Sequence, residues 1–211
     1  MRSNFVRALV GTYLYPITDR QLSGLSHAEQ VAKLSGGGAT LIQLREKSAS
    51  PLEFYQEAEA ALQVARERGV KIIINDRVDI ALALKADGVH LGQEDLAPAA
   101  ARRILGPNAI IGFSTHNLEQ ARLARQQPVD YIAIGPVFAT STKQSSNSPI
   151  GLKELALVRR SLGGIPLVAI GGISVESLGA VLKAGADAVA VISGIWGFGT
   201  NAPTKRPLNF S

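Results

Sequence analysis

The feature that most constrains this chain is an alternation of short apolar runs with helical patterns, repeated along nearly the whole sequence. The eight apolar runs cover residues 12–18, 40–45, 71–75, 88–91, 110–114, 131–135, 166–170 and 188–192. They are apolar at nearly every position, which is typical of parallel strands whose two faces are both covered. Eight strands in strict β-then-α order within 211 residues predict the α/β class and a single-domain (β/α)8 TIM barrel.

A doubly wound open sheet is the alternative architecture. Such a sheet usually has fewer strands and a glycine-rich fingerprint after the first one, whereas the first run here leads into Asp19 and Arg20. We therefore expect an N-terminal segment over 1–11, the (β/α)8 catalytic barrel over 12–196 and a coil tail over 197–211. Because the tail shows no helical period, the eighth helix should be short or absent.

Helix starts are marked by serine followed three residues later by glutamate. Ser26 with Glu29, and Ser50 with Glu53, have the spacing of a capping box, in which each side chain accepts a hydrogen bond from the other residue's backbone. Pro51 stands at a first helical position, where its missing N–H leaves no hydrogen bond unmade. These signals place helices after the first two apolar runs.

Composition excludes several kinds of chemistry and partner. The absence of cysteine rules out disulfides, thiolate zinc sites and a cysteine nucleophile. The net charge is +5, but both terminal segments carry basic residues without acids, so the body is nearly balanced and we expect no nucleic-acid partner. The uncharged runs are too short for a membrane span and no secretion signal is evident, so we expect no membrane partner and a cytoplasmic location. The sequence leaves a homo-oligomer open.

Active-site groups of a TIM barrel lie at the carboxyl ends of its strands and in the loops that follow. The second run ends with residues 43–47, and the alternation of a strand places Gln43, Arg45 and Lys47 on one side. An inward-facing arginine requires an anionic partner, because an unpaired buried guanidinium is costly. That partner is either an acid on a neighbouring strand or a bound phosphate or diphosphate, which arginine can hold through two hydrogen bonds.

Two carboxylates follow the next two strands. Asp76 and Asp95 each stand shortly before a predicted helix, so N-capping is one interpretation of either residue alone. Since adjacent strands place both acids at the same rim, the pair also forms a hard oxygen site suited to Mg²⁺ shared with a substrate phosphate. The sequence therefore predicts a magnesium site beside the arginine and the lysine.

Glycine-rich loops after the last two strands predict a second phosphate site. Gly172 lies in the loop after the seventh run, and Ile192 and Ser193 lie where the eighth run ends. Glycines allow backbone amides to approach an anion at a helix N-terminus, and these two loops form the recurrent phosphate site of the barrel. An ordinary turn is the alternative interpretation of either loop alone.

The loop over 136–149 adds hydroxyl groups and a cation. Its polar side chains include Thr140, Ser141, Thr142 and Lys143. Its length and its serine and asparagine content are typical of a mobile lid. Elsewhere on the rim, Ser114 closes the fifth run after Gly112, whose missing side chain should leave space on the inner face.

Seven short motifs occur in a fixed order along the chain. They are 15–20 (YPITDR), 43–47 (QLREK), 74–79 (INDRVD), 90–95 (HLGQED), 135–138 (GPVF), 140–143 (TSTK) and 169–173 (AIGGI). In this order they resemble the motifs of the thiamine-phosphate synthase family, and the resemblance extends over residues 12–196. It implies an enzyme that joins 4-amino-2-methyl-5-(diphosphooxymethyl)pyrimidine to 4-methyl-5-(2-phosphooxyethyl)thiazole, giving thiamine phosphate and diphosphate through a pyrimidinylmethyl cation.

The resemblance also implies roles for individual residues. The catalytic residues would be Arg45, Lys47, Ser114 and Lys143. The pyrimidine diphosphate would contact Gln43, Leu44, Arg45, Glu46, Lys47, Asn75, Ser114 and Lys143. The thiazole phosphate would contact Thr140, Ser141, Thr142, Gly172, Ile192 and Ser193. Asp76 and Asp95 would hold Mg²⁺ as the cofactor.

Two other functions are compatible with the same barrel. A thiazole tautomerase shares the strand end at 75–77 and the paired glycines, but it should not need Mg²⁺. A non-catalytic regulator would bind the thiazole phosphate without releasing diphosphate from the pyrimidine substrate. A metal requirement and diphosphate release therefore separate the three hypotheses.

Overall fold

The structure is a computed structural model, and it describes residues 5, 8–9, 12–140 and 148–196. Its strands are β1 (Leu14–Thr18), β2 (Leu41–Leu44), β3 (Lys71–Asn75), β4 (Gly88–Leu91), β5 (Ile110–Thr115), β6 (Tyr131–Ile134), β7 (Leu167–Ile170) and β8 (Ala188–Val191). All pairings are parallel and follow the sequence order, and β1 also pairs with β8, which closes the barrel. The predicted (β/α)8 barrel is confirmed, and the open sheet is excluded.

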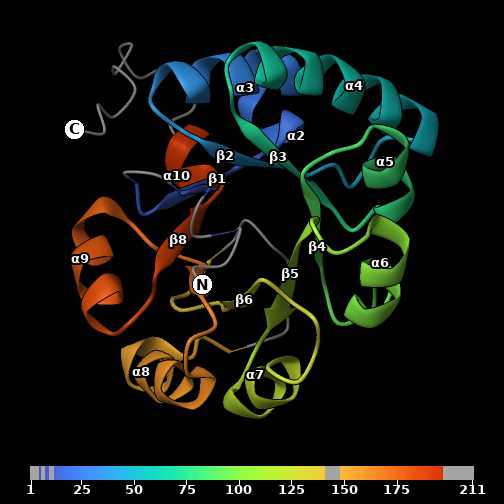
Figure 1. The fold of residues 1–211 in the computed structure, drawn as a ribbon. Coiled ribbons are helices and arrows are strands. Elements are labelled where there is room, and N and C mark those ends of the chain that lie inside the picture. The colour runs from blue at the N-terminus through green and yellow to red at the C-terminus, as the bar shows by residue number, and fades with distance from the viewer. Residues whose placement is uncertain (1–4, 6–7, 10–11, 141–147, 197–211) are drawn as a thin grey trace.

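The connections carry helices that form an outer ring around the strands (Figure 1). They are α2 (Arg20–Ser23), α3 (His27–Gly36), α4 (Pro51–Glu67), α5 (Val78–Ala83), α6 (Pro98–Leu105), α7 (Leu118–Ala124), α8 (Gly151–Leu162), α9 (Val175–Lys183) and α10 (Ser193–Trp196). The last is a single turn of four residues, in line with the short eighth helix that was expected. The coil predicted over 197–211 lies outside the described residues. No helix in the described part of the chain combines the length and hydropathy that crossing a bilayer requires.

Capping follows the sequence signals with one exception. Ser26 and Glu29 form the full capping box at the start of α3. At the start of α4, Ser50 accepts a hydrogen bond from the Glu53 backbone, but the Glu53 carboxylate accepts one from Arg20 at 2.9 Å instead of closing the box. The carboxylate therefore ties α4 to α2, because an arginine from another helix is within its reach.

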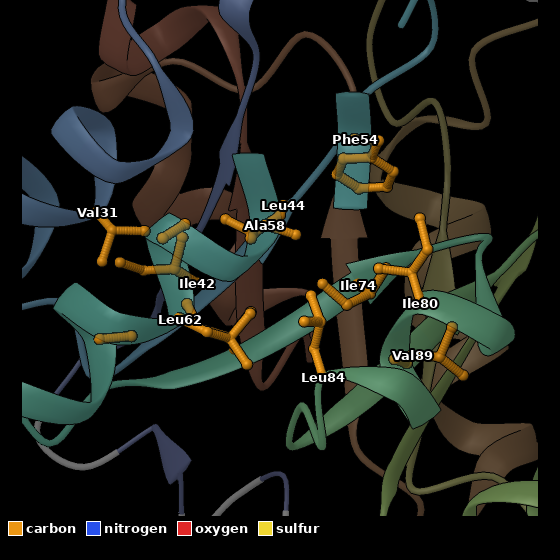
Figure 2. Packing of buried hydrophobic residues seen from close by; sticks show 14 of the residues in the cluster. Val31, Ile42, Leu44, Phe54, Ala58, Leu62, Ile74, Ile80, Leu84 and Val89 are labelled. Carbon is orange, nitrogen blue, oxygen red and sulfur yellow. The ribbon is translucent and has the colours of Figure 1, made fainter. Parts of the chain in front are cut away.

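The apolar strands pack in two concentric layers, because successive side chains of a strand point to opposite faces. In β3, Ile73 faces the barrel interior with Tyr15, whereas Ile72 and Ile74 face the helices. Figure 2 shows part of the outer layer, where Ile74 lies close to Leu84 at the end of α5. Burying each such side chain stabilises the fold by about 1.5–3 kcal/mol.

The described residues of the N-terminal segment pack into the barrel. Phe5 is fully buried, and its ring stacks on Tyr131 with the ring centroids 4.0 Å apart. Thr40 Oγ1, just before β2, donates a hydrogen bond of 2.7 Å to the Ala8 carbonyl. Residues that precede β1 therefore cover the barrel at the amino ends of its strands, away from the rim where chemistry was expected.

Candidate active site

A buried chain of hydrogen bonds crosses the barrel interior and reaches the carboxyl ends of the strands. Gln43 on β2 donates from Nε2 to Tyr15 Oη at 3.0 Å, and Tyr15 Oη lies 3.0 Å from Tyr131 Oη. Tyr131 Oη lies 2.8 Å from His90 Nδ1, and His90 Nε2 lies 2.8 Å from Ser114 Oγ. Burial raises the pKa of both tyrosines, so they remain protonated hydrogen-bonding groups.

These hydrogen bonds position Gln43 and Ser114, two residues that the resemblance assigns to the pyrimidine substrate. A Cβ at Gly112 would lie 2.0 Å from Tyr131 Cζ, so the glycine is required for the tyrosine ring to fit. The space that Gly112 was expected to leave on the inner face is therefore filled by Tyr131. His90 serves as the hydrogen-bonding residue between Tyr131 and Ser114.

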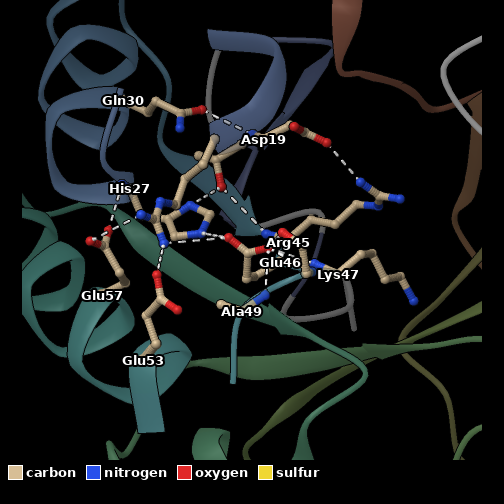
Figure 3. A network of polar contacts seen from close by, with 12 residues as sticks. Asp19, His27, Gln30, Arg45, Glu46, Lys47, Ala49, Glu53 and Glu57 are labelled. Carbon is tan, nitrogen blue, oxygen red and sulfur yellow. Dashed lines mark hydrogen bonds and ion pairs between the residues drawn. The ribbon is translucent and has the colours of Figure 1, made fainter. Parts of the chain in front are cut away.

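Arg45 pairs with an acid from the loop after β1. Arg45 Nη1 lies 2.8 Å from Asp19 Oδ2, and each side chain is only 13% exposed (Figure 3). Of the two partners expected for this arginine, the structure thus shows an internal acid, which is also the N-cap of α2. Arg45 Nε is buried and has no hydrogen-bond partner among the described residues, so the guanidinium keeps an unused donor.

Lys47 and the two predicted metal ligands lie together on the rim. Lys47 Nζ lies 2.5 Å from Asp76 Oδ2. Burial raises the pKa of Asp95, the neighbouring Asp76 carboxylate raises it further, and the Lys47 ammonium lowers it. The structure therefore brings the two acids side by side, as adjacent strands should, with the Lys47 ammonium in contact with Asp76.

Neither carboxylate caps a helix. The N-caps of α5 and α6 are Arg77 and Ala97, and neither makes a side-chain capping bond. Asp95 Oδ2 instead accepts a hydrogen bond from Gly92 N at 2.6 Å. Asp76 has a φ of 63°, which is sparsely populated by residues other than glycine. The capping interpretation is therefore excluded, and the strained backbone of Asp76 is typical of a functional position.

The remaining residues assigned to the pyrimidine substrate differ in whether their side chains are available to contact it. Asn75 is 6% exposed, and its Nδ2 has no hydrogen-bond partner within the described ranges. Leu44 packs in the outer apolar layer. The Glu46 carboxylate accepts hydrogen bonds from the backbone of Ser48 and Ala49 (Figure 3). Burial opposes its ionisation, but these hydrogen bonds prevail and lower the pKa of Glu46. Substrate contacts of Leu44 and Glu46 would therefore use their main chain.

A pocket that is partly open to solvent lies between the loops after β5, β6, β7 and β8. Its lining includes Ser114, Thr140, Gly172, Ile192 and Ser193. Gly172 is required here because its φ is 64° and a Cβ would lie 2.4 Å from the Ala139 carbonyl oxygen. Both predicted glycine loops thus contribute to one pocket. Ser141, Thr142 and Lys143 lie outside the described residues.

Four residues of the site have no role assigned from the sequence. Tyr15 and Asp19 stand in the motif at 15–20 and His90 stands in the motif at 90–95, whereas Tyr131 stands in no motif. A tyrosine in an otherwise apolar strand is a usable signal, because a buried phenol requires a hydrogen-bond partner. No comparable signal pairs Asp19 with Arg45, since that contact depends on how the loops after β1 and β2 fold.

Comparisons with known proteins identify the family. A family model described as thiamine monophosphate synthase matches residues 14–195, which is nearly the whole barrel. The chain belongs to this family. Thiamine-phosphate synthase from Chloroflexus aurantiacus is 46% identical over 188 residues, covering 89% of this chain and 86% of that protein. Thiamine-phosphate synthase from Syntrophomonas wolfei is 48% identical over 185 residues, covering 87% of this chain and 88% of that protein.

A solved structure shows the same relationship. Thiamine phosphate pyrophosphorylase from Pyrococcus furiosus superimposes with a TM-score of 0.82 at 41% identity, covering 93% of this chain and 91% of that one. A 3-hexulose-6-phosphate synthase superimposes with a TM-score of 0.63 at 16% identity, which shows the shared barrel alone. The family suggested by the sequence motifs is therefore confirmed.

Proposed function

We propose that this member of the thiamine monophosphate synthase family condenses 4-amino-2-methyl-5-(diphosphooxymethyl)pyrimidine with 4-methyl-5-(2-phosphooxyethyl)thiazole, giving thiamine phosphate and diphosphate. The supporting observation is one rim that carries two cations and two adjoining carboxylates beside a pocket with glycine-rich loops. Cations near an acid pair suit a diphosphate, and backbone amides in glycine loops suit the phosphate of the second substrate.

The pyrimidine diphosphate would lie with its diphosphate group near Arg45 and Lys47. The bond between the methylene carbon and the diphosphate oxygen breaks, and both electrons leave with the oxygen. The cation that remains on the methylene carbon is stabilised by the amino group of the pyrimidine ring. Arg45 and Lys47, with Lys143 from the loop over 136–149, neutralise charge that grows on the departing oxygens, and such growing stabilisation accelerates the step.

Asn75, Ser114 and Gln43 would orient the pyrimidine ring. The unpartnered Nδ2 of Asn75 would donate a hydrogen bond to a substrate acceptor, which removes the cost of leaving a buried donor unsatisfied. Because His90 holds Ser114 Oγ at 2.8 Å, the hydroxyl is fixed before substrate arrives. A fixed hydroxyl loses less entropy on binding than a free one.

Asp76 and Asp95 fit a divalent cation. Two adjoining carboxylates repel each other, and the single charge of Lys47 offsets that repulsion only in part. Within the described residues there is no group of three or more His, Cys, Asp or Glu side chains placed to hold a metal, so water and substrate oxygens would complete the coordination, as Mg²⁺ prefers. When bound, the metal would add positive charge at the leaving diphosphate.

The thiazole phosphate would occupy the pocket with the glycine-rich loops. The contacts we propose are Thr140, Ser141, Thr142, Gly172, Ile192 and Ser193. The thiazole nitrogen attacks the methylene cation with its own lone pair, which is not protonated, so no general base is required. This agrees with a site whose buried His90 is used to hold Ser114.

The test is to incubate the protein with both substrates, with and without Mg²⁺, and to measure thiamine phosphate. We expect product only when the metal is present. Tautomerisation of the thiazole without metal would indicate a tautomerase, and binding of thiazole phosphate without diphosphate release would indicate a regulator. Either result would overturn the proposal. A homo-oligomer and a cytoplasmic location stay predictions.

A further inference from the structure

Lys47 contacts a residue that is assigned to the metal, and Lys47 itself is assigned to the diphosphate. Its Nζ lies 2.5 Å from Asp76 Oδ2, so the ammonium uses an oxygen that a metal would bind. The same ammonium is one of the cations proposed for the diphosphate. A divalent ion on Asp76 would repel the ammonium, so metal binding would weaken the Lys47–Asp76 pair.

The surroundings of Asp76 require a nearby cation when no metal is bound. Its side chain is 20% exposed and lies beside Asp95, whose pKa is raised by burial and by the Asp76 charge. The Asp76 backbone is fixed at a φ of 63°, with its N–H donating to the His90 carbonyl at 2.8 Å. The backbone therefore holds Asp76 at the rim beside Asp95, where the Lys47 ammonium offsets part of the repulsion between the two carboxylates.

Lys47 is able to leave this pair, whereas Arg45 is held in its own. The Lys47 side chain is 55% exposed, and ion pairs between exposed side chains are weak. Its flexible four-carbon stem allows the ammonium to move while the backbone stays bound, through Lys47 N, to Glu46 Oε1 at 2.8 Å. The Arg45–Asp19 pair is mostly buried on both sides.

We propose that Lys47 is the counter-ion of Asp76 in the metal-free protein and that it changes partner, from Asp76 to the diphosphate, when a divalent cation binds. The inference rests on the proposed function, from which it takes both the metal and the diphosphate. Lys47 then competes with the metal before the diphosphate arrives and assists it afterwards. Metal and diphosphate therefore bind cooperatively, and the metal alone binds weakly.

The experiment has two arms, both on the full chain. In the first, Mn²⁺ alone is titrated and the free ion is followed by electron paramagnetic resonance. Lys47→Met should bind Mn²⁺ about threefold to fivefold more tightly than the wild-type protein, because a competing cation is gone. In the second, inorganic diphosphate is titrated calorimetrically at saturating Mg²⁺, and Lys47→Met should bind it about tenfold more weakly, because a charged hydrogen bond is lost. A gain in affinity for Mn²⁺ together with a loss of affinity for diphosphate distinguishes a change of partner from a simple loss of charge.

The matched control is Arg77→Met. Arg77 follows Asp76 directly, but its guanidinium pairs with Asp79 at 2.5 Å, so the variant removes a nearby charge without releasing Asp76. Its affinity for Mn²⁺ should stay within about twofold of the wild-type value, as expected for a screened surface charge. Thermal unfolding of each variant shows that it is folded before affinities are compared.

Two results would overturn the change of partner. One is an equal Mn²⁺ affinity in the wild-type protein and in Lys47→Met. The other is a gain in Mn²⁺ affinity in Arg77→Met as large as that in Lys47→Met, which would mean that any nearby positive charge has the same effect. Asp76→Asn separates these from failure of the proposed function. If Asp76→Asn binds Mn²⁺ as well as the wild-type protein does, the carboxylate pair is not the metal site, and the metal assignment fails together with the inference.

Discussion

Asp76 keeps a backbone conformation that favours glycine, and its carboxylate adjoins a second one. Both features oppose stability, so we attribute their presence to chemistry. Asp76→Gly and Asp76→Ala should each abolish turnover. The glycine variant should be more stable than the alanine variant by about 1 kcal/mol, because a Cβ is disfavoured at positive φ. Urea unfolding and product formation measure the two effects, and turnover retained by either variant would contradict the assignment.

The protonation of Asp95 makes the stability of the protein depend on pH. Burial and the neighbouring Asp76 raise the pKa of Asp95 in the folded protein. A raised pKa means that the folded state favours the protonated form, so this contribution to stability is present at low pH and is lost as pH rises through the folded pKa. At neutral pH and without metal, Asp95→Asn should therefore have a Tm equal to or above that of the wild-type protein. With Mg²⁺ present, the same variant should have lost turnover. A lower Tm would show that the ionised carboxylate is structural.

Tyr131 connects both ends of the buried hydrogen-bond chain. Tyr131→Phe removes the hydroxyl that contacts Tyr15 and His90, leaving two buried polar groups short of a partner. The free energy of unfolding should fall by about 1–3 kcal/mol. Because His90 also holds Ser114, kcat should fall as well, and steady-state kinetics below the Tm of the variant measure this. A normal kcat with reduced stability would mean that the chain supports the fold alone.

At the scale of elements, the loops after the strands divide the work between two phosphate sites. Gly172→Val forces a side chain toward the Ala139 carbonyl and should mainly raise the KM for the thiazole phosphate, whose charge does not change during reaction.

Lys143→Ala, in the loop over 136–149, should lower kcat by at least about tenfold, because the leaving diphosphate gains charge. A Lys143→Ala enzyme with normal kcat and weaker pyrimidine binding would assign Lys143 to positioning.

The elements themselves follow closely from the sequence. Each apolar run became a strand with ends shifted by no more than a few residues, as for 131–135 against Tyr131–Ile134. These runs can be recognised in the sequence because parallel strands covered on both faces are apolar throughout. The incomplete box at Ser50 was not predictable, because it depends on Arg20 reaching Glu53 from a distant part of the chain.

At the scale of the whole molecule, the sequence predicts which rim carries the chemistry but not how its charges pair when no ligand is bound. Strand order alone brings Asp76 and Asp95 together. The Arg45–Asp19 and Lys47–Asp76 pairs depend on loop conformation, which no periodicity encodes. The burial of Phe5 against Tyr131 likewise joins residues far apart in sequence, and it closes the barrel opposite the active rim.

The central claim is that this one rim expels diphosphate from the pyrimidine substrate and lets the thiazole nitrogen take its place. The most direct measurement follows diphosphate and thiamine phosphate in the same time course, with both substrates present. We predict equal amounts of the two products at every time point, formed only with Mg²⁺ and absent in Asp76→Gly. Diphosphate released without matching thiamine phosphate, or equal product formation without metal, would contradict the account.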